Sequence, residues 1–240
     1  MNDLPWPDQQ PFLEVEVGSG YPLSLIPLIS RLSEFSTTLR ACSLSGHGFS
    51  PGSSARSRSD HRTVNKIFLQ TLIDRWKPPS IPSSVSVSTR LVLLTAWRSI
   101  QGAANIYHRR GLGFYSNLTE PIEGLIQEAY TAAIEDLVVN ISFLTRAFQQ
   151  CGTCIANSMA QPIAVMGSEC GGRATAPLQD DVTKIITTIS ETFLLPHLLF
   201  LLEVLQKLWE RQAMCESRAS NECISLEQVT RDNGLFISLL

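Results

Sequence analysis

DVTKIITTISETFLLPHLLFLLEVLQKLWERQ, residues 181–212, is the most informative stretch of this 240-residue chain. Its apolar side chains recur at steps of three and four residues, which places them on one face of a helix. They are Ile185, Ile186, Ile189, Phe193, Leu201, Leu205, Leu208 and Trp209. Pro196 should kink or restart the helix, because proline lacks the N–H and clashes with the preceding turn. The stretch therefore predicts a long amphipathic helical pattern that is interrupted once.

The most apolar run of the chain, TFLLPHLLFLL at 192–202, lies inside this pattern. Glu191 and Glu203 bound the run, and Pro196 and His197 interrupt it. A membrane-spanning helix needs about 18 or more apolar residues. We therefore expect a helix buried in a protein core and no membrane contact, with His197 as a core histidine rather than a metal ligand.

Helical spacing recurs in four stretches nearer the N-terminus. They are Leu25–Leu39, Val64–Trp76, Leu93–Tyr107 and Ile122–Phe148. In the second, the stripe expected to face the core includes Ile67, Phe68 and Leu72. The third has Ser88 as its expected N-cap, and His108, Arg109 and Arg110 precede Gly111 at its end, where cations and then glycine are favoured. Period-two alternation, the pattern of a strand, is not convincing anywhere. The fold class expected is all-α, a single irregular bundle of about five to seven helices.

Composition divides the chain into an extended, Pro-rich lead-in at 1–20 and a helical domain at 21–240. Within the domain, residues 43–60 (SLSGHGFSPGSSARSRSD) are expected to form a flexible Ser/Gly-rich loop, because they bury too little apolar surface to offset the entropy of ordering. Residues 78–88 are a second linker, with three Pro and five Ser.

The charge balance excludes several classes of protein. The formal net charge is -3, from 19 basic and 22 acidic residues, so no basic field is present to hold nucleic-acid phosphates. A small basic cluster is expected to be a solvated loop and helix start. It consists of Arg56, Arg58, Arg62 and Lys66. Residues 1–12 lack the basic and apolar regions of a signal peptide, so we expect a reducing compartment.

The sequence contains no recognisable catalytic or metal-binding motif. Cys151 and Cys154 form a C-x-x-C pair, but no second pair follows at zinc-site spacing. The four His residues include no pair at i, i+4, and neither a phosphate-binding glycine loop nor a nucleophile elbow is present. We therefore expect no catalytic, cofactor-binding or metal-ligating residues, no cofactor and no enzymatic activity.

Four stretches taken together resemble the fungal-specific transcription factor domain, the helical regulatory region of fungal binuclear zinc-cluster activators. They are Gly20–Leu39, Leu94–Arg110, Ser158–Cys170 and Leu205–Arg211. The third, SMAQPIAVMGSEC, is similar to that family's W-P-x-x-x-x-G-x-E-C segment, with Gln161 where Trp is usual. The residues that carry the resemblance are Trp97, Tyr107, Arg109, Arg110, Pro162, Gly167, Glu169, Cys170 and Trp209.

The resemblance implies interior packing rather than chemistry for the third stretch. Pro162 would begin a helix, Gly167 would permit close packing, and Cys170-Gly171-Gly172 would end the helix. The function implied is that of a nuclear transcription regulator controlling a metabolic or biosynthetic gene cluster. Its implied partners are other transcription regulators or coactivators, a second copy of the chain, or a small effector lodged between helices.

The family's zinc cluster needs six Cys in two tight groups near the N-terminus. Here the first Cys is Cys42, and the six are scattered from there to Cys223. The chain is therefore expected to lack its own zinc-cluster motif and to make no direct DNA contact. It would be a shortened paralogue, a fragment of a longer gene product, or a partner that works through other regulators.

Two alternatives stay open at this point. One is a helical enzyme of a fungal biosynthetic pathway, with His197, His108 and Glu169 as its candidate residues and a closed polar pocket as its mark. The other is a truncated, non-functional regulator, which would expose Val92, Trp97 or Leu201 where a partner surface is missing.

Overall fold

The computed structural model describes residues 21–31, 68–110, 120–151, 153–171, 176–217 and 226–232. Within these ranges the chain forms helices and no strand, which confirms the all-α class. Two helical segments at 26–31 and 68–75 come first. The later elements, in chain order, are α4 (Val87–Arg110), α5 (Glu120–Cys151), α6 (Thr153–Ser158), α7 (Ala160–Glu169), the 3-10 turn η1 (Ala176–Leu178), α8 (Gln179–Phe193), α9 (Pro196–Ser217) and α10 (Leu226–Asp232).

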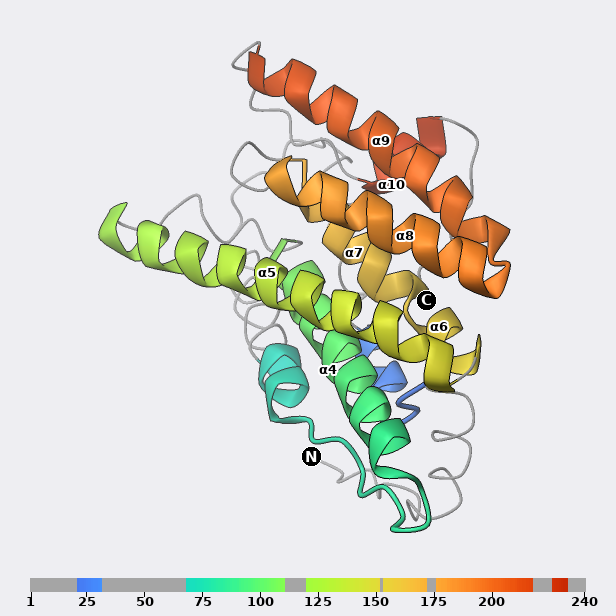
Figure 1. The fold of residues 1–240 in the computed structure, drawn as a ribbon. Coiled ribbons are helices and arrows are strands. Elements are labelled where there is room, and N and C mark those ends of the chain that lie inside the picture. The colour runs from blue at the N-terminus through green and yellow to red at the C-terminus, as the bar shows by residue number, and fades with distance from the viewer. Residues whose placement is uncertain are drawn as a thin grey trace.

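Helix α7 lies at the centre of the bundle. It contacts α4, α5, α6, α8 and α9, while α9 forms an outer edge with α10 beside it (Figure 1). The core is one continuous cluster of buried apolar side chains drawn from α4 through α10 and from the two N-terminal segments. Bundles of this kind gain most of their stability by burying the apolar faces of helices that would be marginal alone.

In α4 and α9, the apolar faces that the sequence predicts to be buried are buried in the structure. Leu93, Trp97 and Ile100 of α4 are buried, as are Leu205 and Leu208 of α9. At the start of α4 the expectation of a Ser88 cap was wrong. Ser86 is the N-cap, because its hydroxyl oxygen accepts the backbone N–H of Thr89 at 3.1 Å, and the helix begins at Val87.

The long pattern at 181–212 is divided in two by a turn at Leu194 and Leu195. Leu194 adopts a left-handed conformation with φ 54°, and the N–H groups of Leu194 and Leu195 both donate to the carbonyl oxygen of Ser190. The Ser190 hydroxyl in turn donates to the carbonyl oxygen of Leu195 at 2.9 Å. Pro196 then begins α9, so the proline restarts the helix rather than kinking it.

The N-terminal segments are held to the bundle by side-chain hydrogen bonds. The Trp76 indole donates to the Ser24 hydroxyl at 3.1 Å, which joins the two segments to each other. The Gln101 amide donates to the carbonyl oxygens of Ile73 and Trp76, at 2.6 and 3.1 Å, and so joins the second segment to α4. The Tyr21 hydroxyl donates to the carbonyl oxygen of Asn157 in α6.

Three expectations about burial were wrong. Phe68 is 58% exposed, because the segment at 68–75 turns Leu69 and Ile73 into the core instead. His197 is exposed on the first turn of α9, so it is not a core histidine. The apolar run at 192–202 is not one buried helix, since it spans the turn between α8 and α9.

Several expectations fall on residues outside those described: the lead-in at 1–20, the loop at 43–60 and the basic cluster from Arg56 to Lys66. Residues 76–86, which overlap the expected linker, are described and contain no helix. In the part of the chain that can be searched, no helix has the length and apolar character needed to cross a membrane.

Candidate functional site

The residues that carry the family resemblance converge on α7. Pro162 lies in the first turn of this helix, where its missing N–H costs nothing. Every residue from Pro162 to Ser168 is buried, so the helix has no solvent-facing side along this length. A helix that is buried all round belongs to the interior of a bundle, where neighbouring helices pack on several sides of it.

Gly167 lies where α7 packs against α9. A Cβ atom at this position would overlap the end of the Leu205 side chain, so a larger residue would force that buried side chain to shift. The carbonyl oxygen of Gly167 accepts the indole N–H of Trp209 at 2.8 Å. Gly167, Leu205 and Trp209, which we call the α7–α9 joint, fix the two helices in one register.

Glu169 connects the same end of α7 to α5. Its carboxylate accepts a 2.6 Å hydrogen bond from the hydroxyl of Tyr130 and a longer one, 3.3 Å, from the hydroxyl of Ser168. A hydrogen bond to a charged oxygen is stronger than one between neutral groups. Tyr130 therefore holds the last residue of α7 against the middle of α5.

Cys170 is the C-cap of α7 and is buried. Its backbone N–H donates to the carbonyl oxygen of Gly167, and its carbonyl oxygen accepts the Gln179 amide at 2.8 Å. Burial, with a further contribution from the negative charge of Glu169, raises the pKa of the Cys170 thiol to about 12. The thiol therefore stays protonated near neutral pH, a state unsuited to a nucleophile or a metal ligand.

The remaining motif residues lie on α4. Trp97 is fully buried, and Tyr107 is partly buried against the core. Arg109 and Arg110 end α4, and their side chains lie outside the part of the chain that is described. The structure thus brings Pro162, Gly167, Glu169, Cys170 and Trp209 together, and places Trp97 and Tyr107 on a helix that packs against α7.

Sequence reasoning missed three residues of this region. They are Tyr130, which contacts Glu169, Leu205, which contacts Gly167, and Gln179, which contacts Cys170. In each pair the two residues come from different elements of the fold. A periodic pattern assigns a side chain to a face but does not name its partner on another helix. The tyrosine in the apolar stripe of α5 was the one available signal, because a buried hydroxyl needs a hydrogen-bond partner.

The two alternatives gain no support from this geometry. Of the candidate catalytic residues, His197 is exposed and Glu169 is engaged by Tyr130 and Ser168. Val92, Trp97 and Leu201 are all at most 4% exposed, so none marks the bare surface of a truncated regulator. Among the described residues, His, Cys, Asp and Glu side chains nowhere gather in a group of three that could hold a metal ion.

A family model described as a fungal specific transcription factor domain matches residues 7–239. The chain belongs to this family. The match covers all four stretches in which the sequence resembles the family, and the observed bundle is all-α as that resemblance implies. Searches of the curated proteins and of the solved structures gave no match. As a fungal specific transcription factor domain, the chain is part of a family of transcription regulators rather than of enzymes.

Proposed function

We propose that this chain is a nuclear regulatory domain that controls transcription through contacts made by its helices, without reading DNA through a zinc cluster of its own. Membership in the fungal specific transcription factor domain family supports the regulatory role. The scattered positions of the six Cys support the second part, because a binuclear zinc cluster needs two tight groups. The partners are other transcription regulators, coactivators or a second copy of the chain.

The observation that carries the proposal is the construction of the α7–α9 joint. Its polar groups are a buried indole N–H and a backbone carbonyl oxygen, which satisfy each other. A buried and satisfied contact of this kind stabilises one relative position of two helices and offers no reactive group. The joint therefore serves to hold α9, at the edge of the bundle, in a defined position from which it can contact another protein.

A reporter assay tests the regulatory role. The chain is fused to an unrelated DNA-binding domain, and transcription from the matching promoter is measured in a fungal host. We expect activation or repression relative to the DNA-binding domain alone, together with nuclear enrichment of the unfused chain. The proposal would be overturned if the fusion had no effect on the reporter and the unfused chain gave no nuclear signal.

Two glycine variants test whether regulation depends on the position of α9. Gly167→Ala forces a methyl group against Leu205 and should reduce the reporter effect by displacing α9. Gly102→Ala is the matched control, because a Cβ at that helical position meets nothing within 4 Å. The control should keep the full effect. Equal activity of the two variants would show that the position of α9 does not matter for regulation.

We further propose that the target genes form a metabolic or biosynthetic cluster. The support is the family resemblance, and the test is transcript sequencing of a strain that lacks this chain. Expression should change for a group of neighbouring genes that encode enzymes. Changes scattered over unlinked genes would contradict this part of the proposal.

A further inference from the structure

The turn between α8 and α9 presents a group of apolar side chains to solvent. The exposed residues of the turn and of the first part of α9 are Leu194, Pro196, His197, Leu199 and Phe200, which we call the α8–α9 tip. The exposed fraction of the side chain is 84% for Leu194, 43% for Leu199 and 39% for Phe200. Single exposed apolar residues are ordinary, but several at one place mark a surface that contacts another molecule.

Leu194 occupies its position at a cost to the folded chain. Its φ of 54° lies in the left-handed region, which no other non-glycine residue enters within the described ranges. Glycine is the usual residue at a helix end of this conformation, because it has no Cβ to clash. The leucine side chain does not offset the strain by packing, since most of it faces solvent. Strain of this kind is typical of positions kept for a function rather than for stability.

The base of the α8–α9 tip is fixed to the bundle. Leu198 is buried, and Phe193 and Leu195 pack partly buried against the core. The carbonyl oxygen of Ser190 accepts the backbone N–H groups of Leu194 and Leu195, and the Ser190 hydroxyl donates to the carbonyl oxygen of Leu195. The exposed side chains therefore stand on an ordered turn, and covering them costs little conformational entropy of the backbone.

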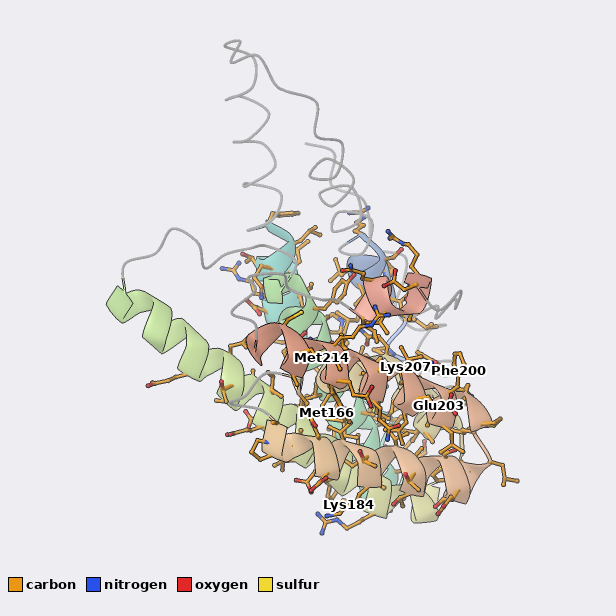
Figure 2. All side chains as sticks on the ribbon, turned by 90° about the horizontal axis from the view of Figure 1, so that it is seen from above. Met166, Lys184, Phe200, Glu203, Lys207 and Met214 are labelled. Carbon is orange, nitrogen blue, oxygen red and sulfur yellow. The ribbon has the colours of Figure 1, made fainter. Side chains whose placement is uncertain are left out.

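Acidic side chains flank the α8–α9 tip on both helices. Glu191 lies three residues before Leu194, Glu203 lies three residues after Phe200, and both glutamates are exposed. Figure 2 shows Phe200 and Glu203 toward the same end of α9, with Lys207 farther along the helix from the tip. Opposite charges are favoured across an interface, so a partner that covers this surface needs apolar side chains at its centre and Lys or Arg at its edges.

The same acidic rim disfavours two other occupants. Two copies of the chain that met at this surface would bring two acidic rims together, and like charges opposite each other are unfavourable. The anionic lipids of a membrane surface attract Lys and Arg, and they repel glutamate. A basic partner protein remains, and an amphipathic helix is a recurring form in which one protein covers an apolar surface of another.

We propose that the α8–α9 tip binds a basic amphipathic helix of another protein. The apolar face of that helix covers Leu194 and Phe200, and its Lys or Arg side chains lie against Glu191 and Glu203. The inference rests on the proposed function, since it names the chemistry of a partner through which the domain regulates transcription.

Fluorescence anisotropy with two synthetic peptides tests the proposal. The first peptide is an amphipathic helix of leucine and lysine, with the leucines at steps of three and four residues. The second has glutamate in place of every lysine. Each labelled peptide is titrated with the full 240-residue chain. The lysine peptide should bind, and the glutamate peptide should bind at least about tenfold more weakly, because its charges face the acidic rim.

Two substitutions in and beside the tip identify the binding surface. Leu194→Gly should weaken binding of the lysine peptide by about tenfold, because it removes the central apolar side chain. It should do so without unfolding the chain, since glycine suits the left-handed turn. Glu203→Lys should weaken binding of the lysine peptide and strengthen binding of the glutamate peptide, because it reverses one charge of the rim.

Val87→Ser is the matched control. Val87 is 79% exposed, close to the value for Leu194, but it begins α4, and α4 starts well away from the α8–α9 turn in Figure 1. This variant should bind the lysine peptide as the unmodified chain does. Equal weakening by Val87→Ser and Leu194→Gly would overturn the proposal, because the peptide would then be attracted to the chain without a defined surface.

The other outcomes are equally separable. A chain that does not bind the lysine peptide overturns the proposal. If such a chain instead self-associates in sedimentation, or floats with vesicles of phosphatidylserine and phosphatidylcholine, and Leu194→Gly abolishes this behaviour, the tip belongs to a second copy or to a membrane. Peptide binding is measured without a reporter. Binding through the tip with an inactive reporter fusion would overturn the proposed function alone, and an active fusion without peptide binding would overturn this inference alone.

Discussion

The indole N–H of Trp209 donates a 2.8 Å hydrogen bond to the backbone carbonyl oxygen of Gly167, a residue 42 positions earlier. The same oxygen accepts the backbone N–H of Cys170 at 3.2 Å. Two of the stretches that carry the family resemblance therefore meet at a single atom. Their residue types follow from this contact: a glycine admits α9, and a tryptophan both fills the space and satisfies the carbonyl.

Trp209→Phe tests the hydrogen bond separately from the packing. Phenylalanine keeps an aromatic ring in the core but removes the donor, and Cys170 still satisfies the carbonyl oxygen in part. The free energy of unfolding should fall by about 1 kcal/mol in urea denaturation. Trp209→Ala, which also empties the site, should cost about 3–5 kcal/mol. Equal losses in the two variants would mean that the hydrogen bond, rather than the ring, dominates.

Gly167→Ala and Gly102→Ala should shift stability in opposite directions. Alanine at 167 overlaps Leu205 and should destabilise the chain by about 1–3 kcal/mol, the usual cost of overpacking. Alanine at 102 meets nothing and should stabilise it by about 0.4–1 kcal/mol, because it restricts the unfolded chain. Thermal or urea unfolding of both variants gives the comparison. Adding Leu205→Ala to Gly167→Ala should make the two losses non-additive, since the substitutions share one contact.

The helical faces could be predicted from periodicity, but the ends of the helices were less certain. The stripes in α4 and α9 were correct because apolar residues at steps of three and four have one way to be buried together. Ser86 was missed as the cap of α4 because it lies in a row of serines, and any of them could have accepted the N–H. Phe68 was placed on the wrong face because the Val64–Trp76 stripe is short and offers two adjacent faces.

The types of residue in the site could be predicted from the sequence, but the contacts between those residues could not. Gly167 was recognised as a position of close packing, but neither Leu205 nor Trp209 could be assigned to it from the sequence. Tyr130 and Glu169 lie 39 residues apart on two helices. Their contact depends on how α5 crosses α7, and that crossing is set by the packing of the whole core rather than by either local pattern.

Leu194→Gly should stabilise the chain. Leu194 has φ 54°, a conformation that costs an ordinary L-residue roughly 1–2 kcal/mol, and its side chain is 84% exposed and loses little packing. Glycine removes the backbone strain but adds freedom to the unfolded chain, so the net gain should be about 0.5–1 kcal/mol. The midpoint of thermal unfolding reports the change. Leu195→Gly is the control: this side chain packs against the core, and its loss should lower the midpoint.

The Cys170 thiol should remain unreactive in the folded chain and should make stability depend on pH in the alkaline range. Burial raises its pKa from 9.0 to about 12, so the folded state keeps the proton that the unfolded state loses above pH 9. The thiol's contribution to stability is therefore complete below about pH 9 and is lost as pH rises toward 12, by up to about 1.4 kcal/mol per pH unit. Cys170→Ala should flatten this part of the profile in urea unfolding.

Alkylation followed by peptide mass mapping gives a second measurement of the Cys170 thiol. The partly exposed Cys215 should be modified in the native chain, and Cys170 only after denaturant is added. Native modification of Cys170 at the rate of Cys215 would show that the end of α7 opens readily.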